Sequence, residues 1–413
     1  MTVSAPPRPP APARTAPDTK PLEREEIEVL VEALIEEARR ETRRRHRTYW
    51  AVAGLLAFVG VVVLILLEGG AASQISSPAL SARMNTAAQA ATSKIAFIRE
   101  PPFSGYCGTV WVMNADGSGQ RRLTNGGVPG CGQEGGHAWS PDGRQVALES
   151  PDGIFVMNAD GSKQRRLTQL GGRPAWSPDG RRIAFVTGRD GSSGIYVINA
   201  DGTEQRLLMP AVTYSGQPAW SPNGEKIAFT IELPKAPAAQ TRDLEIYVVN
   251  ADGSGQQRLT RSTVRDNDPV WSPDGRRIAF ESNWQLWVMN ADGSGKRRLT
   301  RKEAHNFNPA WSPEGKRIAF ERGRKEREVS SGAAGSWGFG LYVMNADGSG
   351  QQRLTQGGSQ PYWSPDGRKI AFVSNRDSNG DIHVMNADGS GRRNLTRAAG
   401  RRDTQPLWSP AQK

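Results

Sequence analysis

Histidine is scarce in this chain of 413 residues, which contains four, and cysteine is rarer still, with two. The histidines lie far apart in the sequence, at His46, His137, His305 and His383. A catalytic triad needs a nucleophile, a base and an orienting group close together, and metal sites need several clustered ligands. We therefore expect a protein that is not an enzyme and that holds no metal.

Charge is absent from residues 49–67, the run YWAVAGLLAFVGVVVLILL between Tyr49 and Leu67. About 20 apolar residues in a helix cross the hydrocarbon core of a bilayer. A cleaved signal peptide has a shorter apolar run and a shorter segment before it. The sequence therefore predicts one uncleaved transmembrane helix.

Positive charge is also absent after this run, since no Lys or Arg occurs between Leu67 and Arg83. The segment before the run is rich in arginine, at Arg39, Arg40, Arg43, Arg44, Arg45 and Arg47. Cytoplasmic flanks carry the excess of Lys and Arg in membrane proteins. We expect a single-pass protein of the cell membrane, with a cytoplasmic N-terminus and an extracytoplasmic remainder.

Three further segments precede the rest of the chain. Residues 1–21 form a Pro/Ala-rich tail that is expected to be disordered. Residues 22–48 have the apolar spacing of an amphipathic cytoplasmic helix. This helix, through residues 22–47, either stays solvated beside the membrane or contacts a partner or a second copy. Residues 68–92, rich in Ala, Ser and Gly, are expected to be a flexible stalk.

A repeat of 40 to 55 residues accounts for residues 93–410. Each of its seven copies contains four signals in a fixed order: Ile-Ala-Phe, Tyr-Val-Met-Asn-Ala-Asp-Gly, Arg-Leu-Thr and Trp-Ser-Pro-Asp-Gly, with small variations. Short runs of β-branched and aromatic residues between turn residues predict a four-stranded antiparallel meander. A single meander cannot bury both faces, so the units must stack radially.

The sequence thus predicts an all-β fold, a seven-bladed β-propeller of four-stranded antiparallel blades. We call the strands of a blade A, B, C and D from the axis outward, with Trp-Ser-Pro ending strand A. The chain enters the repeat on a B strand at Ile95 and leaves it on an A strand at Trp408. We expect residues 405–410 to complete the blade begun by residues 94–124, which leaves no open edge.

The repeat resembles that of a known family. PAWSPDGRRIAF, from Pro174 to Phe185, and LYVMNADGSGQQRLT, from Leu341 to Thr355, are similar to the TolB-like (PD40, WD40-like) propeller repeat. The resemblance covers residues 93–410 and implies the same propeller fold. Some propellers of this type precede hydrolase domains, whereas others act as binding scaffolds.

The acidic turns are interpreted as structural. Asn-Ala-Asp-Gly and Ser-Pro-Asp-Gly have the residues of a tight turn that ends on a left-handed glycine. Neither turn has the alternating oxygen ligands and distal Glu of a calcium loop. The fragment GSGK, Gly293 to Lys296, lacks the first glycine of a phosphate loop. We expect no cofactor.

The net charge of +11 raises the question of an anionic partner. Paired arginines such as Arg121 and Arg122 enter the outermost strand of most repeats. A solvated outer edge is the simplest interpretation, and attraction to an anionic envelope polymer is the alternative. We expect no nucleic-acid partner, because no nucleic-acid-binding motif accompanies the charge.

Length variation places the expected ligand site on one face. The B–C and D–A connections vary in length and share a face, whereas the A–B and C–D turns are short. Aromatic anchors are expected in the long loops, at Phe103, Tyr106, Trp337 and Phe339. A polar ring is expected where the A strands begin, at Arg173, Gln217, Asp268, Asn308, Gln360 and Gln405. This ring either grips a ligand or lines a water-filled channel mouth.

Cys107 and Cys131 fall in adjoining loops of the same face. Outside the cytoplasm such a pair forms a disulfide, which would stabilise the fold by about 3 kcal/mol on the chain-entropy model. We therefore expect a Cys107–Cys131 bridge.

Together these features predict a non-catalytic, membrane-anchored receptor or scaffold that binds a protein, a peptide or an envelope polymer on the B–C/D–A loop face. The alternative is a signalling regulator, whose propeller senses an external ligand and whose cytoplasmic helix contacts a partner. A propeller associated with a hydrolase is a third hypothesis.

Overall fold

The computed structural model describes residues 93–100, 108–124, 136–150, 152–187, 194–210, 214–233, 243–301, 303–324, 339–374, 376, 380–397 and 400–410. Twenty-eight strands lie in these ranges. The described residues include no helix that is long and apolar enough to cross a bilayer. The predicted tail, cytoplasmic helix, transmembrane helix and stalk of residues 1–92 lie outside the described residues.

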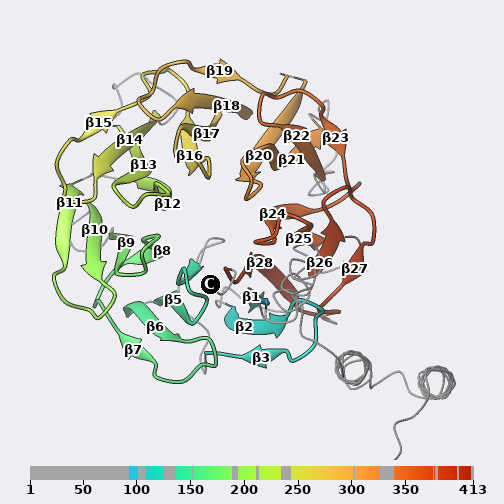
Figure 1. Ribbon diagram of the computed structural model, residues 1–413, viewed down its shortest axis with the longest axis horizontal. Coiled ribbons are helices and arrows are strands. Elements are labelled where there is room, and N and C mark those ends of the chain that lie inside the picture. Colours follow the sequence, from blue (N-terminus) through green and yellow to red (C-terminus); the bar gives the residue numbers. More distant parts are fainter. Residues whose placement is uncertain are drawn as a thin grey trace, which may run out of the picture. The chain divides into compact units, whose positions relative to one another are not determined.

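Seven four-stranded antiparallel sheets are arranged in a ring (Figure 1), which confirms the predicted all-β, seven-bladed propeller. The A strands are β4 (His137–Trp139), β8 (Gly172–Trp176), β12 (Tyr214–Trp220), β16 (Asp266–Trp271), β20 (Ala304–Trp311), β24 (Ser359–Trp363) and β28 (Arg402–Trp408). The B strands are β1 (Lys94–Glu100), β5 (Gln145–Ser150), β9 (Arg182–Thr187), β13 (Lys226–Glu232), β17 (Arg277–Ser282), β21 (Arg317–Arg324) and β25 (Lys369–Ser374).

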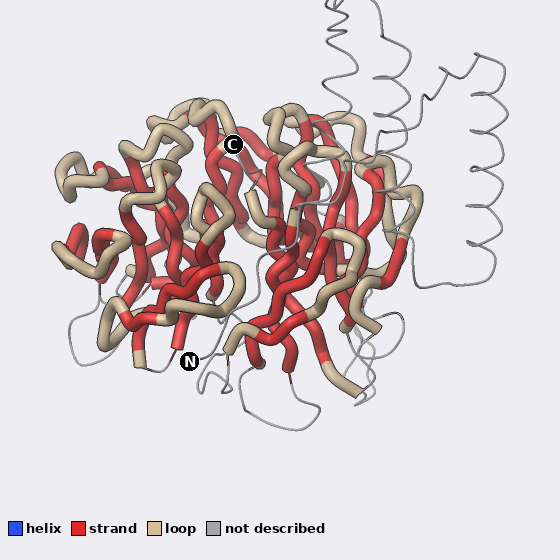
Figure 2. The backbone as a smooth tube through the Cα atoms, turned by 60° about the horizontal axis from the view of Figure 1, so that its bottom comes forward, coloured by secondary structure: helices blue, strands red, loops and turns tan. Residues whose placement is uncertain are grey.

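The C strands are β2 (Thr109–Asn114), β6 (Gly153–Asn158), β10 (Gly194–Asn199), β14 (Leu244–Asn250), β18 (Gln285–Asn290), β22 (Gly340–Asn345) and β26 (Asp381–Asn386). The D strands are β3 (Arg121–Arg122), β7 (Arg165–Arg166), β11 (Arg206–Pro210), β15 (Gln257–Arg258), β19 (Arg297–Arg298), β23 (Gln352–Arg353) and β27 (Arg393–Asn394). Figure 2 shows the strands of neighbouring blades side by side, connected by loops at both ends.

The ring closes through the first blade, as the phase of the repeat predicted. β28 pairs with β1, and Ile95 lies opposite Trp408. The Arg99 guanidinium donates to both carboxylate oxygens of buried Asp403, each at 2.8 Å. This paired, desolvated contact fixes the register of the closing strand.

The seven tryptophans of the A strands form a second ring inside the first. Each is buried, and six donate the indole N–H to a backbone carbonyl of the preceding A strand. The pairs are Trp139 to Leu407 (3.1 Å), Trp176 to Ala138 (3.2 Å), Trp220 to Ala175 (3.0 Å), Trp271 to Ala219 (3.1 Å), Trp311 to Val270 (3.2 Å) and Trp363 to Ala310 (3.0 Å). Among the described residues, the indole nitrogen of Trp408 has no such partner. The six bonds tie each blade to its neighbour near the axis.

The outer arginines are more than a solvated edge. The first residue of a D strand reaches across to the Asn-Ala-Asp-Gly turn of the next blade in several places. Arg121 donates to the carbonyl of Ala159 at 3.2 Å, and Arg297 to that of Asp347 at 2.7 Å. Arg393 closes the series by donating to the carbonyl of Asp116 at 3.1 Å. These cations therefore join neighbouring blades along the outer rim.

The carboxylates of the acidic turns accept hydrogen bonds from groups of the same turn. In the first of them, Asp116 Oδ1 accepts hydrogen bonds from the backbone N–H (2.9 Å) and hydroxyl (2.7 Å) of Ser118. Gly117 and Gly119 both have positive φ. Among the described residues, no group of three or more His, Cys, Asp or Glu side chains is placed to hold a metal ion. The carboxylates stabilise the turns.

His137 replaces the proline that stands two residues before the tryptophan in the other A strands. It is 2 % exposed, and neither ring nitrogen has a hydrogen-bond partner among the described residues. Burial lowers the pKa of this imidazole from 6.5 to about 4.

The pKa of His137 predicts sensitivity to acid. The unfolded chain takes up the proton near pH 6.5, and the folded chain takes it up only near pH 4. The stability that this group contributes is therefore complete above pH 6.5 and is lost as the pH drops towards 4. We expect this group to remove about 2 kcal/mol from the free energy of unfolding between pH 7 and pH 5. In urea titrations at both values, the change in stability from pH 7 to pH 5 should differ between His137→Leu and wild type by about this amount, and an equal change in the two proteins would contradict the assignment.

Candidate ligand site at the channel mouth

The A strands share a backbone irregularity at the predicted polar ring. In all of them except β4, the pairing with the B strand shifts register near the Pro-x-Trp sequence, as between Phe307 and Ala310 in β20. A β-bulge of this kind re-aims side chains. Five ring residues have positive φ: Arg173 (54°), Asp268 (52°), Asn308 (48°), Gln360 (53°) and Gln405 (53°). In β12, Gly216 has that conformation (φ 83°), and Gln217 follows it.

The fold thus brings the six ring residues to equivalent places on the inner strands. Backbone conformations of this sort are costly for residues other than glycine, by roughly 1–3 kcal/mol each. Such strain persists where surrounding contacts enforce it, and it gathers at functional sites.

Glutamates on the B strands supply one of those contacts. Glu149 Oε2 accepts the backbone N–H of Arg173 in the next blade at 3.0 Å. Glu281 and Glu321 repeat the arrangement, because each Oε1 accepts a backbone N–H at 2.7 Å, from Asn308 and Gln360 respectively. Each carboxyl group therefore holds the strained residue of the neighbouring blade.

The seventh blade achieves the same contact by another route. Val373 stands where the glutamate would be in β25. The side chain of Gln360 takes its place, and its Oε1 accepts the backbone N–H of Gln405 at 2.7 Å. The ring positions are therefore supported by side-chain oxygens around much of the mouth.

The acidic side chains gather at the fifth and sixth blades. Glu281 and Glu321 are each 5 % exposed. Burial, with Asp268 and Glu321 nearby, raises the pKa of Glu281 from 4.5 to about 8. Burial also raises the pKa of Glu321, opposed by hydrogen bonds from Gln360 N and the Asn308 amide. The mouth is thus most acidic at these two blades, and Glu281 is largely protonated at neutral pH.

Other ring groups remain available to a ligand. The side chains of Gln217 and Asn308 are exposed, although each donates one hydrogen bond, to the Pro174 carbonyl (2.6 Å) and to Glu321 Oε1 (2.5 Å). Tyr362 in β24 is 41 % exposed and alternates with buried Trp363. These amides, carboxyls and a phenol suit recognition by hydrogen bonds.

The predicted aromatic anchors are only partly described. Phe103, Tyr106 and Trp337 lie outside the described residues, as do Cys107 and Cys131, so the disulfide stays a prediction. Phe339 is described, and its ring meets that of Phe307 edge to face at 5.9 Å. It therefore belongs to an aromatic cluster on the expected loop face.

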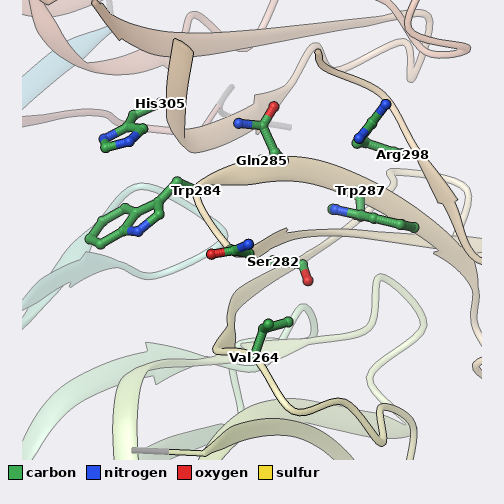
Figure 3. Close-up of a pocket in the computed structure, with 8 residues that line it drawn as sticks. Val264, Ser282, Trp284, Gln285, Trp287, Arg298 and His305 are labelled. Atoms are coloured by element: carbon green, nitrogen blue, oxygen red, sulfur yellow. The ribbon is translucent and has the colours of Figure 1, made fainter. Parts of the chain in front are cut away.

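The central residue of that cluster, Trp284, was not predicted from the sequence. Trp284 stands in a two-residue B–C turn, and it lines a pocket of about 340 Å³ in the fifth blade (Figure 3). Aromatic anchors were predicted only in the long loops. The signal was instead a tryptophan in the tight turn Ser-Asn-Trp-Gln. The supporting glutamates were missed as well, although Phe-Glu ends the Ile-Ala-Phe signal in two repeats.

His383, in the C strand β26, is buried and lies 5.6 Å from the ring of Phe372. It occupies the position of Tyr or Trp in most other C strands and packs in the same way. It is remote in sequence from the other histidines and takes no part in the ring.

Comparisons with known proteins agree with the fold. Residues 174–336 match the family described as TolB beta propeller domain, PD40. The structure of TolB from Acinetobacter baumannii is similar, with a TM-score of 0.50 and 19% identity over 78% of this chain and 67% of that one. A puromycin hydrolase is similar with a TM-score of 0.57 and 15% identity, over 75% of this chain and 52% of that one.

An oligogalacturonate lyase solved with manganese has a TM-score of 0.53 and 14% identity, over 74% of this chain and 85% of that one. A segment of 39 residues is 46% identical to dipeptidyl-peptidase 5 of Porphyromonas gingivalis, and it spans 9% of this chain and 6% of that protein. Because the sequence identities between these structures and the chain are below 20%, the structural similarities show a shared fold and nothing further.

Proposed function

We propose, with the TolB-type repeat of residues 174–336 as the premise, that this protein is a non-catalytic binding propeller anchored in the cell membrane. The propeller stands outside the cytoplasm and binds a protein, a peptide or an envelope polymer. The ligand docks on the B–C/D–A loop face, at the mouth of the channel.

The ring of strained polar residues carries this proposal. Its members occupy equivalent bulges, and carboxyl groups of the B strands hold several of them in place. A scaffold alone does not need a left-handed Asp, Asn or Gln where glycine fits better. Strain maintained in this way favours a preorganised recognition surface.

The anchor and the orientation rest on the sequence. The uncharged run of residues 49–67 and the arginines before it support a single-pass span with a cytoplasmic N-terminus. The excess of positive charge supports an anionic partner among envelope polymers.

The non-catalytic assignment is supported by the chemistry of the mouth. The mouth presents the side-chain amides of the ring and the Tyr362 phenol, and the carboxyls of Glu281 and Glu321 beside the ring are engaged by backbone N–H groups. Since similar propellers occur in a hydrolase and a lyase, the purified full chain should be assayed for ester, peptide and uronate-polymer cleavage. Turnover by the chain would contradict this part of the proposal.

Photo-crosslinking tests the proposed face. We expect probes at Gln217 and Tyr362, in the full chain expressed in its own cells, to capture one recurrent product. Probes at Gln164 and Lys296 serve as controls, because both are exposed beside the C–D turns of the opposite face. Mass spectrometry and polymer stains identify the product. Equal capture from the two faces would contradict a site at the channel mouth.

A further inference from the structure

The turn between β17 and β18 holds a tryptophan in a conformation that tryptophan rarely adopts. Asn283 and Trp284 have φ of 46° and 64°, as in a type I′ hairpin turn. Asparagine tolerates this region, but a bulky residue in it is an outlier. Trp284 is also 45 % exposed, so burial of its ring does not explain its presence.

Neighbouring groups hold the Trp284 ring in one place. The backbone carbonyl of Trp284 accepts the backbone N–H of Asn306 at 2.9 Å. The imidazole of His305 stacks on the indole, with centroids 5.2 Å apart and planes at 14°. Phe307 meets the indole edge to face at 5.4 Å. The strained turn thus presents a rigid aromatic surface to solvent.

A second wall stands across the pocket. Figure 3 shows Trp284 and His305 on one side, Trp287 and Arg298 on the other, and Gln285 between them. Ligand pockets run from about 300 to 1,000 Å³. A volume of about 340 Å³ therefore fits one small ring-sized group.

The repeat shows why no carboxylate among the described residues pairs with Arg298. In the fourth blade the equivalent arginine, Arg258, lies 2.9 Å from the carboxylate of Glu245. In the fifth blade that glutamate is replaced by Gln285, whose amide oxygen accepts from Thr300 Oγ1 at 3.0 Å.

The bond that retains the equivalent arginines is also missing. Arg122, Arg258 and Arg353 each fold back and donate Nε to the carbonyl of the threonine two residues later. Among the described residues, the Arg298 guanidinium has neither this partner nor a carboxylate. It lines the pocket with its donors available.

We propose that this pocket binds a carboxylated sugar residue. The apolar face of a sugar ring packs on an aromatic surface, and ring hydroxyls suit the amide of Asn283 and the hydroxyl of Ser282. A carboxylate suits the planar fork of Arg298. The site is built around the β17–β18 turn and the outer strands of the fifth blade, with His305 of β20 in the sixth blade, and none of the six ring residues lines it.

The same observations disfavour other ligands. An aromatic cage for a quaternary ammonium needs a site without cations, whereas Arg265 lies 5.9 Å from the Trp284 centroid and Arg298 lines the pocket. An extended peptide adds to a free strand edge, and here that edge is the two-residue β19, Arg297–Arg298.

Calorimetry and ligand-observed NMR on the full chain in detergent test the proposal with sodium glucuronate, a glucuronate disaccharide, glucose and a short acidic peptide. We expect saturable binding of glucuronate that is at least tenfold tighter than that of glucose. Trp284→Gly removes the aromatic surface and relieves the positive φ, so the variant should fold, and its glucuronate affinity should drop at least tenfold.

Arg298→Gln should lower the affinity for glucuronate about tenfold and leave glucose within twofold, so the preference for the acid disappears. Arg297→Gln is the matched control, because this neighbour donates to the Asp347 carbonyl and should bind glucuronate normally. Absence of saturable sugar binding, binding of the peptide alone, or equal affinity in wild type and Trp284→Gly would overturn the proposal. Crosslinking at Gln217 and Tyr362 would be unchanged by these variants, so failure here leaves the channel-mouth test independent.

Discussion

Glu281→Gln is expected to make the propeller more stable at pH 8 and to remove the loss of stability that Glu281 contributes between pH 5 and pH 8. The carboxyl group is 5 % exposed, and its pKa is raised to about 8 by burial and by Asp268 and Glu321. The unfolded chain releases this proton near pH 4.5, whereas the folded chain retains it until about pH 8.

The sign follows from this difference. The folded state binds more protons at Glu281 between the two pKa values, so the stability that this group contributes is fully present below pH 4.5 and is lost as the pH rises towards 8. We expect this group to lower the free energy of unfolding by about 3 kcal/mol between pH 5 and pH 8. Glutamine stays neutral, and its oxygen still accepts the Asn308 N–H, so the variant keeps the contact without the ionisation.

Urea titrations at pH 5, 6, 7 and 8 measure the effect in the full chain. Glu303→Gln is the matched control, because it removes the same charge from an exposed position and should leave the slope against pH unchanged. If Glu281→Gln and wild type lose stability in parallel, the carboxyl group is not held in its neutral form.

Trp311→Ala is expected to destabilise the propeller more than any of the other substitutions. The side chain is 8 % exposed and packs in a core with Ala279, Ile318 and Met344. Truncating a buried tryptophan costs roughly 3–5 kcal/mol in transfer energy and cavity formation. The variant also loses the bond to Val270, which ties the fifth and sixth blades. Chemical unfolding should show this loss, and a cost below about 1 kcal/mol would contradict the role of the tryptophan ring.

Substitution by phenylalanine separates packing from hydrogen bonding. Trp311→Phe leaves the Val270 carbonyl without its donor, and Trp408→Phe removes an indole N–H that has no partner among the described residues. Both variants lose similar volume. We expect Trp408→Phe to be the milder by about 1–2 kcal/mol, and equal costs would show that the hydrogen bonds contribute little.

The sequence predicted the architecture because the same four strand and turn signals occur in each of the seven repeats. The order of Ile-Ala-Phe and Trp-Ser-Pro predicted which strand lies innermost, and the offset between Ile95 and Trp408 predicted how the first blade is completed. The equivalent positions of the ring residues were also predictable, because Arg173 and its counterparts hold one position relative to each tryptophan, whereas their role as a ligand site stays a prediction.

The contacts that hold the ring residues and line the Trp284 pocket could not be predicted from the repeat pattern. The bulges depend on φ values, and the contact of Glu281 with Asn308 joins different blades, so neither is visible in a single repeat. Trp284 lies in a short turn, and loop length gave no reason to select it. The freed guanidinium of Arg298 becomes apparent only when Gln285 is compared in space with Glu245.

The closing seam has a consequence for how the molecule is made. Lys94 and Ser409 bond across 315 residues of sequence, and β1 has no inner neighbour until β28 arrives. Closing so long a loop is paid for in chain entropy before its contacts form, and distant pairings of this kind fold slowly. During synthesis the inner edge of β1, with its apolar Ile95 and Phe97, remains an open strand that can pair with another chain. Blades two to seven can assemble as the chain grows, but the propeller closes only when β28 pairs with β1, which is a single late step.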